Sequence, residues 1–135
     1  MTEKSILVVE DEREIASGYC SALREVSMKV LTASSGQDAL LKIRNQTFHL
    51  LVCDLKMPKL SGDRLIHILR SDPLYIQTPI IMASAFIDSA VVSSFGHDKR
   101  LRFLVKPVRG SQLVKVALEM LDRPAPTEAA QPLKS

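Results

Sequence analysis

Residues 50–58 read Leu-Leu-Val-Cys-Asp-Leu-Lys-Met-Pro, and they place a carboxylate directly after an apolar run. The four apolar residues Leu50–Cys53 are typical of a strand that is buried on both faces of a parallel sheet. A carboxylate inside that layer would cost several kcal/mol unless it were paired, whereas at the strand's end it can face a polar crevice. Met57 precedes a proline and is pushed out of the helical region, so a loop follows the strand. We therefore expect Asp54 to be a working carboxylate at the carboxyl end of a central strand.

Strand-like and helical patterns alternate along the rest of the chain. Apolar runs typical of strands occupy residues 5–9, 29–33, 50–53, 79–84 and 101–105. Apolar residues at helical spacing occupy the segments between and after them, at 13–26, 35–43, 65–69, 86–95 and 113–121. This alternation predicts an α/β fold, with a parallel sheet covered by helices on both faces. Ser35 is expected to cap the second helix, and Gly96 to end the fourth.

The composition is that of one globular domain. The chain has 135 residues, of which 46% are hydrophobic and 24% charged, and this balance excludes general disorder. Every apolar run is far shorter than the about 20 residues that span a membrane, and no signal-peptide pattern opens the chain, so we expect a cytoplasmic protein without membrane contact. The Pro- and Ala-rich end lacks an apolar period, which predicts a domain over residues 1–123 and a disordered tail or linker over 124–135.

Cysteine usage and charge exclude some functions. Cys20 and Cys53 fall in helical and strand patterns and are interpreted as small, reduced core residues, and no Cys or His cluster has zinc spacing. The net charge of +3 is uneven, because the basic excess lies between His97 and Arg123. Few aromatic residues accompany it, which favours a solvated or protein-docking face over direct nucleic-acid binding.

Polar side chains follow four of the five predicted strands. They are Glu10 and Asp11 after the first strand, Asp54 after the third, Ser84 at the end of the fourth and Lys106 after the fifth. Open α/β sheets bind ligands outside the carboxyl ends of their strands, so these side chains are expected to share one crevice. Three crowded carboxylates without His or Cys favour Mg²⁺ as the cation that relieves their repulsion. Lys106 would then be free to pair with an anion brought by the substrate.

A carboxylate beside Mg²⁺, with an ammonium and a hydroxyl facing the same space, suits phosphoryl transfer. Asp54 would attack phosphorus and form an aspartyl phosphate. Mg²⁺ and Lys106 would offset charge on the equatorial oxygens, and Ser84 would donate a hydrogen bond to one of them. Catalysis would be limited to the chain's own phosphoryl transfer and autodephosphorylation, unlike that of a conventional enzyme.

These motifs resemble the receiver domain of two-component response regulators, over about residues 4–122. The matching stretches are Val8-Val9-Glu10-Asp11-Glu12, Asp54-Leu-Lys-Met-Pro58 with Gly62, Met82-Ala83-Ser84-Ala85 and Phe103-Leu-Val-Lys106-Pro107. The resemblance implies a flavodoxin-like, doubly wound (βα)5 fold with strand order 2-1-3-4-5. It implies transfer of phosphate to Asp54 from a sensor histidine kinase or a phosphotransfer protein. It also implies that the Lys56 carbonyl joins Glu10, Asp11 and Asp54 around Mg²⁺, and that the Lys106–Pro107 peptide is cis.

The resemblance also suggests a conformational switch and residues that set the lifetime of the phosphoryl group. Once phosphate forms, Ser84 would move toward it, and the Phe103 ring would turn inward into the space that Ser84 leaves. Lys56 and Phe86 occupy the positions that tune the phosphate's lifetime in this family. Neither side chain orients an attacking water, so we expect a long-lived phosphoryl group.

The expected output face combines the fourth helix, the fifth strand and the last helix. The fourth helical segment carries more apolar residues than one inward stripe needs, and the basic excess lies alongside. Homodimerisation through this face is the first expectation, with an acidic partner second. The segment Ser93–Leu101 departs from the family pattern, so the surface of the fourth helix is the part that the resemblance describes least well.

Other functions fit the residues less well. A haloacid-dehalogenase-type phosphatase needs a second Asp two residues after the nucleophile, where this chain has Lys56. A flavodoxin needs a phosphate-binding loop after the first strand, where residues 10–12 are acidic and would repel phosphate. Two alternatives concern the role of a receiver: a protein-interaction module that is never phosphorylated, and the input domain of a larger regulator with an output domain beyond the C-terminus.

Overall fold

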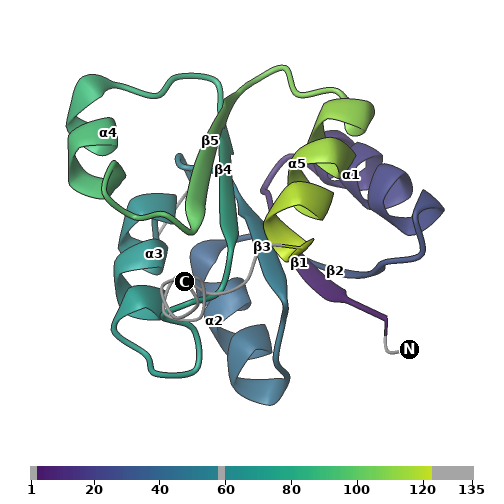
Figure 1. Cartoon of the computed structure of the whole chain (residues 1–135), viewed down its shortest axis with the longest axis horizontal. Coiled ribbons are helices and arrows are strands. Elements are labelled where there is room, and N and C mark those ends of the chain that lie inside the picture. Colours follow the sequence, from purple (N-terminus) through teal and green to yellow (C-terminus); the bar gives the residue numbers. More distant parts are fainter. Residues whose placement is uncertain (1–2, 58–59, 123–135) are drawn as a thin grey trace, which may run out of the picture.

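Five parallel strands form a single sheet in the order β2-β1-β3-β4-β5 (Figure 1). The strands are β1 (Ser5–Val9), β2 (Lys29–Ala33), β3 (Leu50–Cys53), β4 (Ile80–Ser84) and β5 (Leu101–Val105). This computed structural model describes residues 3–57 and 60–122, so the predicted tail over 124–135 lies outside the described residues. The strand order confirms the flavodoxin-like, doubly wound fold.

Helices cover both faces of the sheet (Figure 1). They are α1 (Arg13–Glu25), α2 (Gly36–Asn45), α3 (Gly62–Arg70), α4 (Ser89–Phe95) and α5 (Gly110–Asp122). Helices α1 and α5 pack on one face, whereas α2, α3 and the last turn of α4 contribute to the apolar cluster on the other. No helix among the described residues is both long and apolar enough to cross a bilayer.

The central strand β3 is buried on both faces because its side chains alternate between the two apolar clusters. Leu50 and Val52 face the α1/α5 cluster, while Leu51 and Cys53 face the α2/α3 cluster. Strands β1 and β4 flank β3 and complete its hydrogen bonding. The apolar run therefore ends at Cys53 together with strand β3, and Asp54 lies at the carboxyl edge of the sheet.

Local signals set most helix boundaries, with one difference from prediction. Ser35 caps α2 as expected, because its hydroxyl accepts a hydrogen bond from the backbone N–H of Asp38 at 3.1 Å. The fourth helix was predicted from Phe86, but it begins at Ser89. The Asp88 carboxylate accepts the N–H of Val91 at 2.9 Å, and this cap leaves the first predicted residues in the β4–α4 connection.

The state of the cysteines and one proline peptide bond agree with prediction. Cys20 and Cys53 are both buried and unpaired, as predicted for reduced core residues. The Lys106–Pro107 peptide bond is cis, as the resemblance implied.

Candidate functional site

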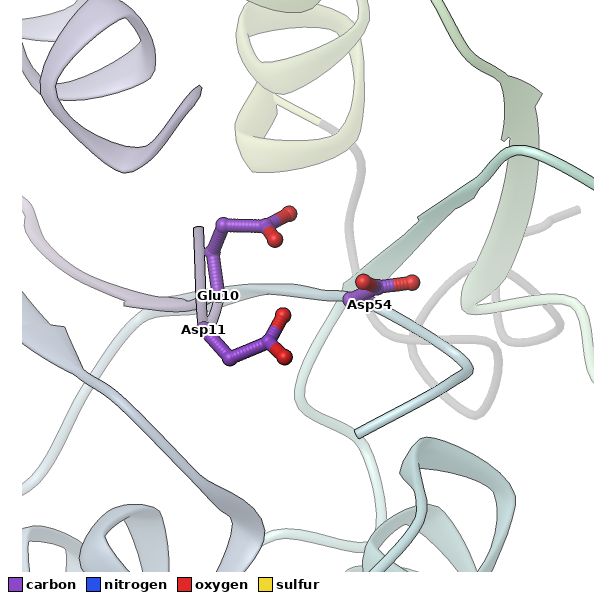
Figure 2. A group of neighbouring side chains, drawn as sticks. All are labelled: Glu10, Asp11 and Asp54. Atoms are coloured by element: carbon purple, nitrogen blue, oxygen red, sulfur yellow. The ribbon is translucent and has the colours of Figure 1, made fainter. Parts of the chain in front are cut away.

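Three carboxylates meet at the carboxyl ends of β1 and β3. Figure 2 shows Glu10 and Asp11, which follow β1, beside Asp54, which follows β3. One carboxylate oxygen from each residue lies within 4.8 Å of the other two. Glu10 and Asp54 are buried, whereas Asp11 is exposed. The structure thus brings together the three acidic residues that the sequence placed in one crevice.

Backbone hydrogen bonds extend the sheet as far as these residues. The N–H of Asp54 donates to the carbonyl of Val9 at 3.0 Å, and that of Glu10 donates to the carbonyl of Ala33 at 3.0 Å. Each acid is therefore fixed at its backbone by the neighbouring strand. This rigidity holds two buried carboxylates near each other despite their repulsion.

The loop after Asp54 folds back over the strand end. The N–H of Lys56 donates to Asp54 Oδ1 at 3.2 Å, and that of Gly62 donates to the carbonyl of Leu55 at 2.8 Å. A Cβ atom at Gly62 would collide with the carbonyl oxygen of Asp54, so only glycine allows this approach. The loop thereby keeps one oxygen of Asp54 bonded to backbone. The Lys56 carbonyl as a magnesium ligand stays a prediction.

Lys106 lies among the carboxylates and is paired with two of them. Its Nζ atom lies 2.7 Å from Glu10 Oε1 and 3.3 Å from Asp54 Oδ2. The expectation that Lys106 is free for a substrate anion supposed Mg²⁺ among the carboxylates, and it stays a prediction. A buried pair of carboxylates needs a nearby positive charge, and Lys106 is the cation that reaches both.

Burial and these contacts shift the pKa values of Glu10 and Lys106. Burial raises the pKa of Glu10, and the hydrogen bond from Lys106 offsets only part of that effect. Burial by itself would lower the pKa of Lys106, but the hydrogen bond to Glu10 and the charge of Asp54 raise it overall. Lys106 therefore stays charged throughout the neutral range.

The remaining predicted residues lie on the strands and loops beside this cluster. Ser84 is buried at the end of β4, and its carbonyl accepts the N–H of Lys106 at 2.8 Å. Phe103 on β5 is half-buried and packs against the apolar cluster under α2, α3 and α4. Lys56 Nζ lies 5.8 Å from the ring centroid of Phe86, which is 60% exposed. This contact joins the two residues expected to tune the phosphate's lifetime.

Tyr19 is a residue near the site that the sequence reasoning missed. It is buried on α1, and burial raises the pKa of its phenol, with smaller effects from the charges of Lys106, Glu10 and Asp54. It lines a cavity of about 460 Å³ that also reaches Lys106 and Pro107. Its helical spacing marked Tyr19 as a core residue, and nothing in the sequence indicated that α1 lies beside Lys106.

The donor set fits a hard divalent cation. Three carboxylates without His or Cys, one of them exposed, match the ligand preference of Mg²⁺, which binds few protein oxygens and keeps several waters. Lys106 adds an ammonium 3.3 Å from Asp54 to the same cluster. The arrangement can therefore hold a metal, a nucleophilic carboxylate and a compensating ammonium together.

Comparisons with known proteins agree with this geometry. Residues 6–118 match the model of the response regulator receiver domain. The chain is 29% identical over 112 residues to Protein PilG of Pseudomonas aeruginosa, with 81% of each chain covered. It is 34% identical to the probable transcriptional regulator ycf27 of Pyropia yezoensis, over 82% of this chain and 44% of that protein. It spans 18% of Protein RcaC of Microchaete diplosiphon, so several relatives are much longer.

Solved structures show the same fold. Chemotaxis protein CheY4 of Vibrio cholerae aligns with a TM-score of 0.82 at 24% identity, covering 88% of this chain and 99% of its own. A CheY-like receiver domain protein of Methanospirillum hungatei aligns with a TM-score of 0.79 at 27% identity, covering 90% and 95%. The chain belongs to the response regulator receiver family. It is a receiver domain of two-component signalling, and Glu10, Asp11 and Asp54 form an acidic pocket of the kind in which such domains bind Mg²⁺.

Proposed function

We propose that this chain accepts a phosphoryl group on Asp54 from the phosphohistidine of a sensor kinase or phosphotransfer protein. The observation that supports this role most directly is the position of Asp54. Its carboxylate follows the central strand, lies within 4.8 Å of two other carboxylates and is 3.3 Å from the Lys106 ammonium. This chain belongs to the receiver domain family, and receiver domains interact with such kinases and phosphotransfer proteins. Membership of the family therefore supports this role.

The transfer is a substitution at phosphorus. An oxygen of Asp54 forms a bond to the phosphorus atom while the bond from phosphorus to the donor's imidazole nitrogen breaks. The electron pair of that bond stays on the nitrogen, which takes up a proton from solvent. The product is an acyl phosphate on Asp54. Most of the protein's contribution is positioning and charge compensation, because the transition state spreads negative charge over the phosphoryl oxygens.

Lys106 and Ser84 supply contacts for those oxygens. Lys106 is already 3.3 Å from Asp54, so a small movement away from Glu10 would let its ammonium pair with an incoming phosphoryl oxygen. Ser84 ends the adjacent strand β4 and would donate its hydroxyl to another oxygen. Glu10, Asp11, Asp54 and the Lys56 carbonyl would hold Mg²⁺, which supplies positive charge to the same oxygens.

Movement of Ser84 would reach the output face through β5. Ser84 lies opposite Val105 in the sheet register, and Phe103 lies two residues before Val105 on the same strand. We infer that Phe103, which is half-buried, turns inward when Ser84 is drawn to the phosphoryl group. The face would then change shape at α4, β5 and α5.

That face suits a second copy of the chain. Its exposed apolar residues come from all three elements: Val92 on α4, Val105 on β5 and Leu118 on α5. Arg102 and the exposed Lys115 lie on the same strand and helix as Val105 and Leu118. An apolar patch bordered by charge is typical of a protein interface, so homodimerisation after phosphorylation is proposed here, and a covalently linked output domain is the alternative use.

Intact-mass spectrometry tests the acceptor. Incubation with acetyl phosphate and Mg²⁺ should add about 80 Da, the mass of one phosphoryl group, and omission of Mg²⁺ should abolish the addition. Asp54→Asn should remain unmodified. Asp63→Asn is a matched control, because Asp63 lies nearby at the start of α3 but outside the acidic cluster. Modification of Asp54→Asn at the wild-type level would show that another residue is the acceptor.

A further inference from the structure

One side chain of α3 fastens the C-terminal end of α4 to the body of the protein. Arg70 Nε donates to Asp98 Oδ2 at 2.7 Å. The two terminal nitrogens of Arg70 donate to the carbonyl oxygens of Tyr75 at 2.8 Å, Thr78 at 2.7 Å and Arg100 at 3.3 Å. One guanidinium thus joins three segments: the end of α3, the turn before β4 and the connection from α4 to β5. The planar geometry of arginine makes such multiple bonding possible, and lysine could not reproduce it.

Asp98 is the partner of Arg70, and we call this pair the Arg70–Asp98 clamp. Its carboxylate accepts the N–H of Arg100 at 2.9 Å as well as the bond from Arg70, and its own N–H donates to the carbonyl of Phe95 at 2.9 Å. The side chains of Arg70 and Asp98 are each only 15% exposed, so water screens their attraction less than that of a surface pair. The Arg70–Asp98 clamp therefore fixes the last turn of α4 relative to the start of β5.

A second contact from α3 reaches the same end of α4. The rings of His67 and Phe95 lie with their centroids 5.0 Å apart. His67 and Arg70 are three residues apart on α3 and hence share one face of that helix. Phe95 is also the one buried residue of α4. Figure 1 shows α4 at the edge of the molecule next to α3, as these contacts require.

The N-terminal half of α4 is held by apolar packing, because the half-buried Val91 contacts the apolar cluster of α2 and α3. Its cap is local, because Asp88 and Val91 belong to the same segment. Phe86 in the β4–α4 connection is 60% exposed, and Val92 on α4 is 44% exposed. Among the residues that the structure describes, no side-chain hydrogen bond or ion pair connects residues 86–92 to another helix or strand. Residues 85–88 connect Ser84 to this end of α4, so it is the end that movement of Ser84 would reach first.

We propose that the Arg70–Asp98 clamp is the fixed pivot of α4. When Asp54 is phosphorylated, the N-terminal end of α4 moves with the β4–α4 connection while the C-terminal end stays on α3. The trigger of this movement, phosphorylation of Asp54, rests on the proposed function. The Arg70–Asp98 clamp is present in the structure independently of that function. A seven-residue helix is only about 10 Å long and moves as a rigid unit, so a shift at one end with the other end held becomes a tilt. The tilt would change the exposed surface of α4 without separating it from the protein.

Amide hydrogen exchange measured by mass spectrometry tests the pivot, with and without beryllofluoride and Mg²⁺ as the phosphoryl mimic. In the wild type, the mimic should change exchange over residues 86–92 at least about fivefold and over residues 95–101 less than twofold. Asp98→Asn should speed exchange over 95–101 about tenfold before any mimic is added, and the mimic should then affect both ends. Arg70→Lys keeps the charge but loses the multiple bonding, so it should give an intermediate increase. Asp72→Asn is the control, because Asp72 bonds only within the neighbouring turn.

The outcomes separate the pivot from the acceptor role. Equal responses of both ends in the wild type would overturn the pivot, as would wild-type exchange over 95–101 in both Asp98→Asn and Arg70→Lys. No response to the mimic at either end would overturn the proposed function together with the pivot's trigger, while faster exchange in Asp98→Asn would still show that the clamp anchors α4. If Asp98→Asn does not fold, the wild-type comparison and Arg70→Lys decide the matter.

Discussion

The ammonium of Lys106 lies 2.7 Å from a carboxylate oxygen of Glu10, a residue 96 positions earlier in the chain. This pair joins the end of β5 to the end of β1 across the acidic cluster. Lys106 also lies 3.3 Å from Asp54, and it thereby offsets the charge of two buried carboxylates. A cation that binds the same oxygens must compete with Lys106 for them.

Removal of that ammonium should therefore strengthen magnesium binding. Lys106→Met should bind Mg²⁺ about tenfold more tightly than the wild type, because three carboxylates would remain without an internal counter-ion. The same variant should accept phosphate from acetyl phosphate at least about a hundredfold more slowly. Titration calorimetry measures the first effect independently of the second, and Lys115→Met on α5 is the control. Weaker magnesium binding in Lys106→Met would show that Lys106 does not compete with the metal.

Tyr75 should make stability fall at alkaline pH. Its hydroxyl donates to the carbonyl oxygens of Ile43 at 3.3 Å and Gln46 at 3.1 Å, and burial raises its pKa above 10.0. Because the folded-state pKa is raised, the folded protein holds this proton more tightly than the unfolded chain. The stabilisation is complete below pH 10 and is lost as the pH rises through the folded-state pKa.

Tyr75→Phe isolates this contribution. The variant should lose about 1 kcal/mol at pH 7, because two backbone carbonyls lose their hydroxyl donor. Its unfolding free energy should fall less steeply than that of the wild type as the pH rises above 10. Urea unfolding at pH 7 and at several values above 10 measures both effects. Parallel curves for the two proteins would show that Tyr75 does not titrate on unfolding.

The phosphoryl group on Asp54 should be long-lived. The Lys56 ammonium lies over the exposed Phe86 ring at 5.8 Å, and neither side chain offers a base that would orient an attacking water. Lys56→Asn/Phe86→Glu should lose its phosphate about tenfold faster at saturating Mg²⁺. Decay of the phosphorylated mass measures the rate, with Lys29→Asn on β2 as the control for loss of a lysine elsewhere. An equal or slower rate in the double variant would exclude control by this pair.

Arg102 should matter for assembly more than for stability. Its ion pair with Glu119 is 3.4 Å long and nearly half exposed, so it contributes at most about 1 kcal/mol. Arg102→Glu should weaken dimerisation in the presence of beryllofluoride and leave Tm almost unchanged. Sedimentation velocity gives the oligomeric state, and Arg44→Glu on α2 is the control. A wild type that stays monomeric with beryllofluoride would show that α4, β5 and α5 do not form a dimer interface.

Phe103 should change rotamer with the state of the acceptor site. Crystal structures with and without beryllofluoride should show the ring further inside the protein when the mimic is bound. Phe103→Ala should leave phosphorylation of Asp54 within about twofold of the wild type, because the ring lies on β5 and outside the acidic cluster. One rotamer in both structures would make Phe103 an ordinary packing residue.

Much of the fold could be predicted from neighbouring residues. The apolar run Leu50–Cys53 had to be buried on both faces, and the charge of Asp54 had to end it, because burial without a partner is costly. The cap at Ser35 was equally local. The sequence placed polar residues at the strand ends, namely Glu10, Asp11, Ser84 and Lys106. Their meeting in one place then followed because the carboxyl ends of parallel strands lie at the same edge of the sheet. The order of the strands came from the family resemblance, because alternation alone allows several arrangements.

Contacts between distant side chains needed the tertiary structure. The sequence placed Lys106 at the same sheet edge as the carboxylates, but its pairing with Glu10 depends on tertiary packing, because the cost of burying a carboxylate favours a nearby cation. The Arg70–Asp98 clamp was equally hidden, whereas Lys56 and Phe86 had been named together from the family resemblance and only the geometry of their contact was new. The periodicity of apolar residues shows which face of a helix or strand is buried, because residues only a few positions apart define that face. Which charged groups meet depends on strand register and helix position, and their attraction acts through space between residues that the sequence separates.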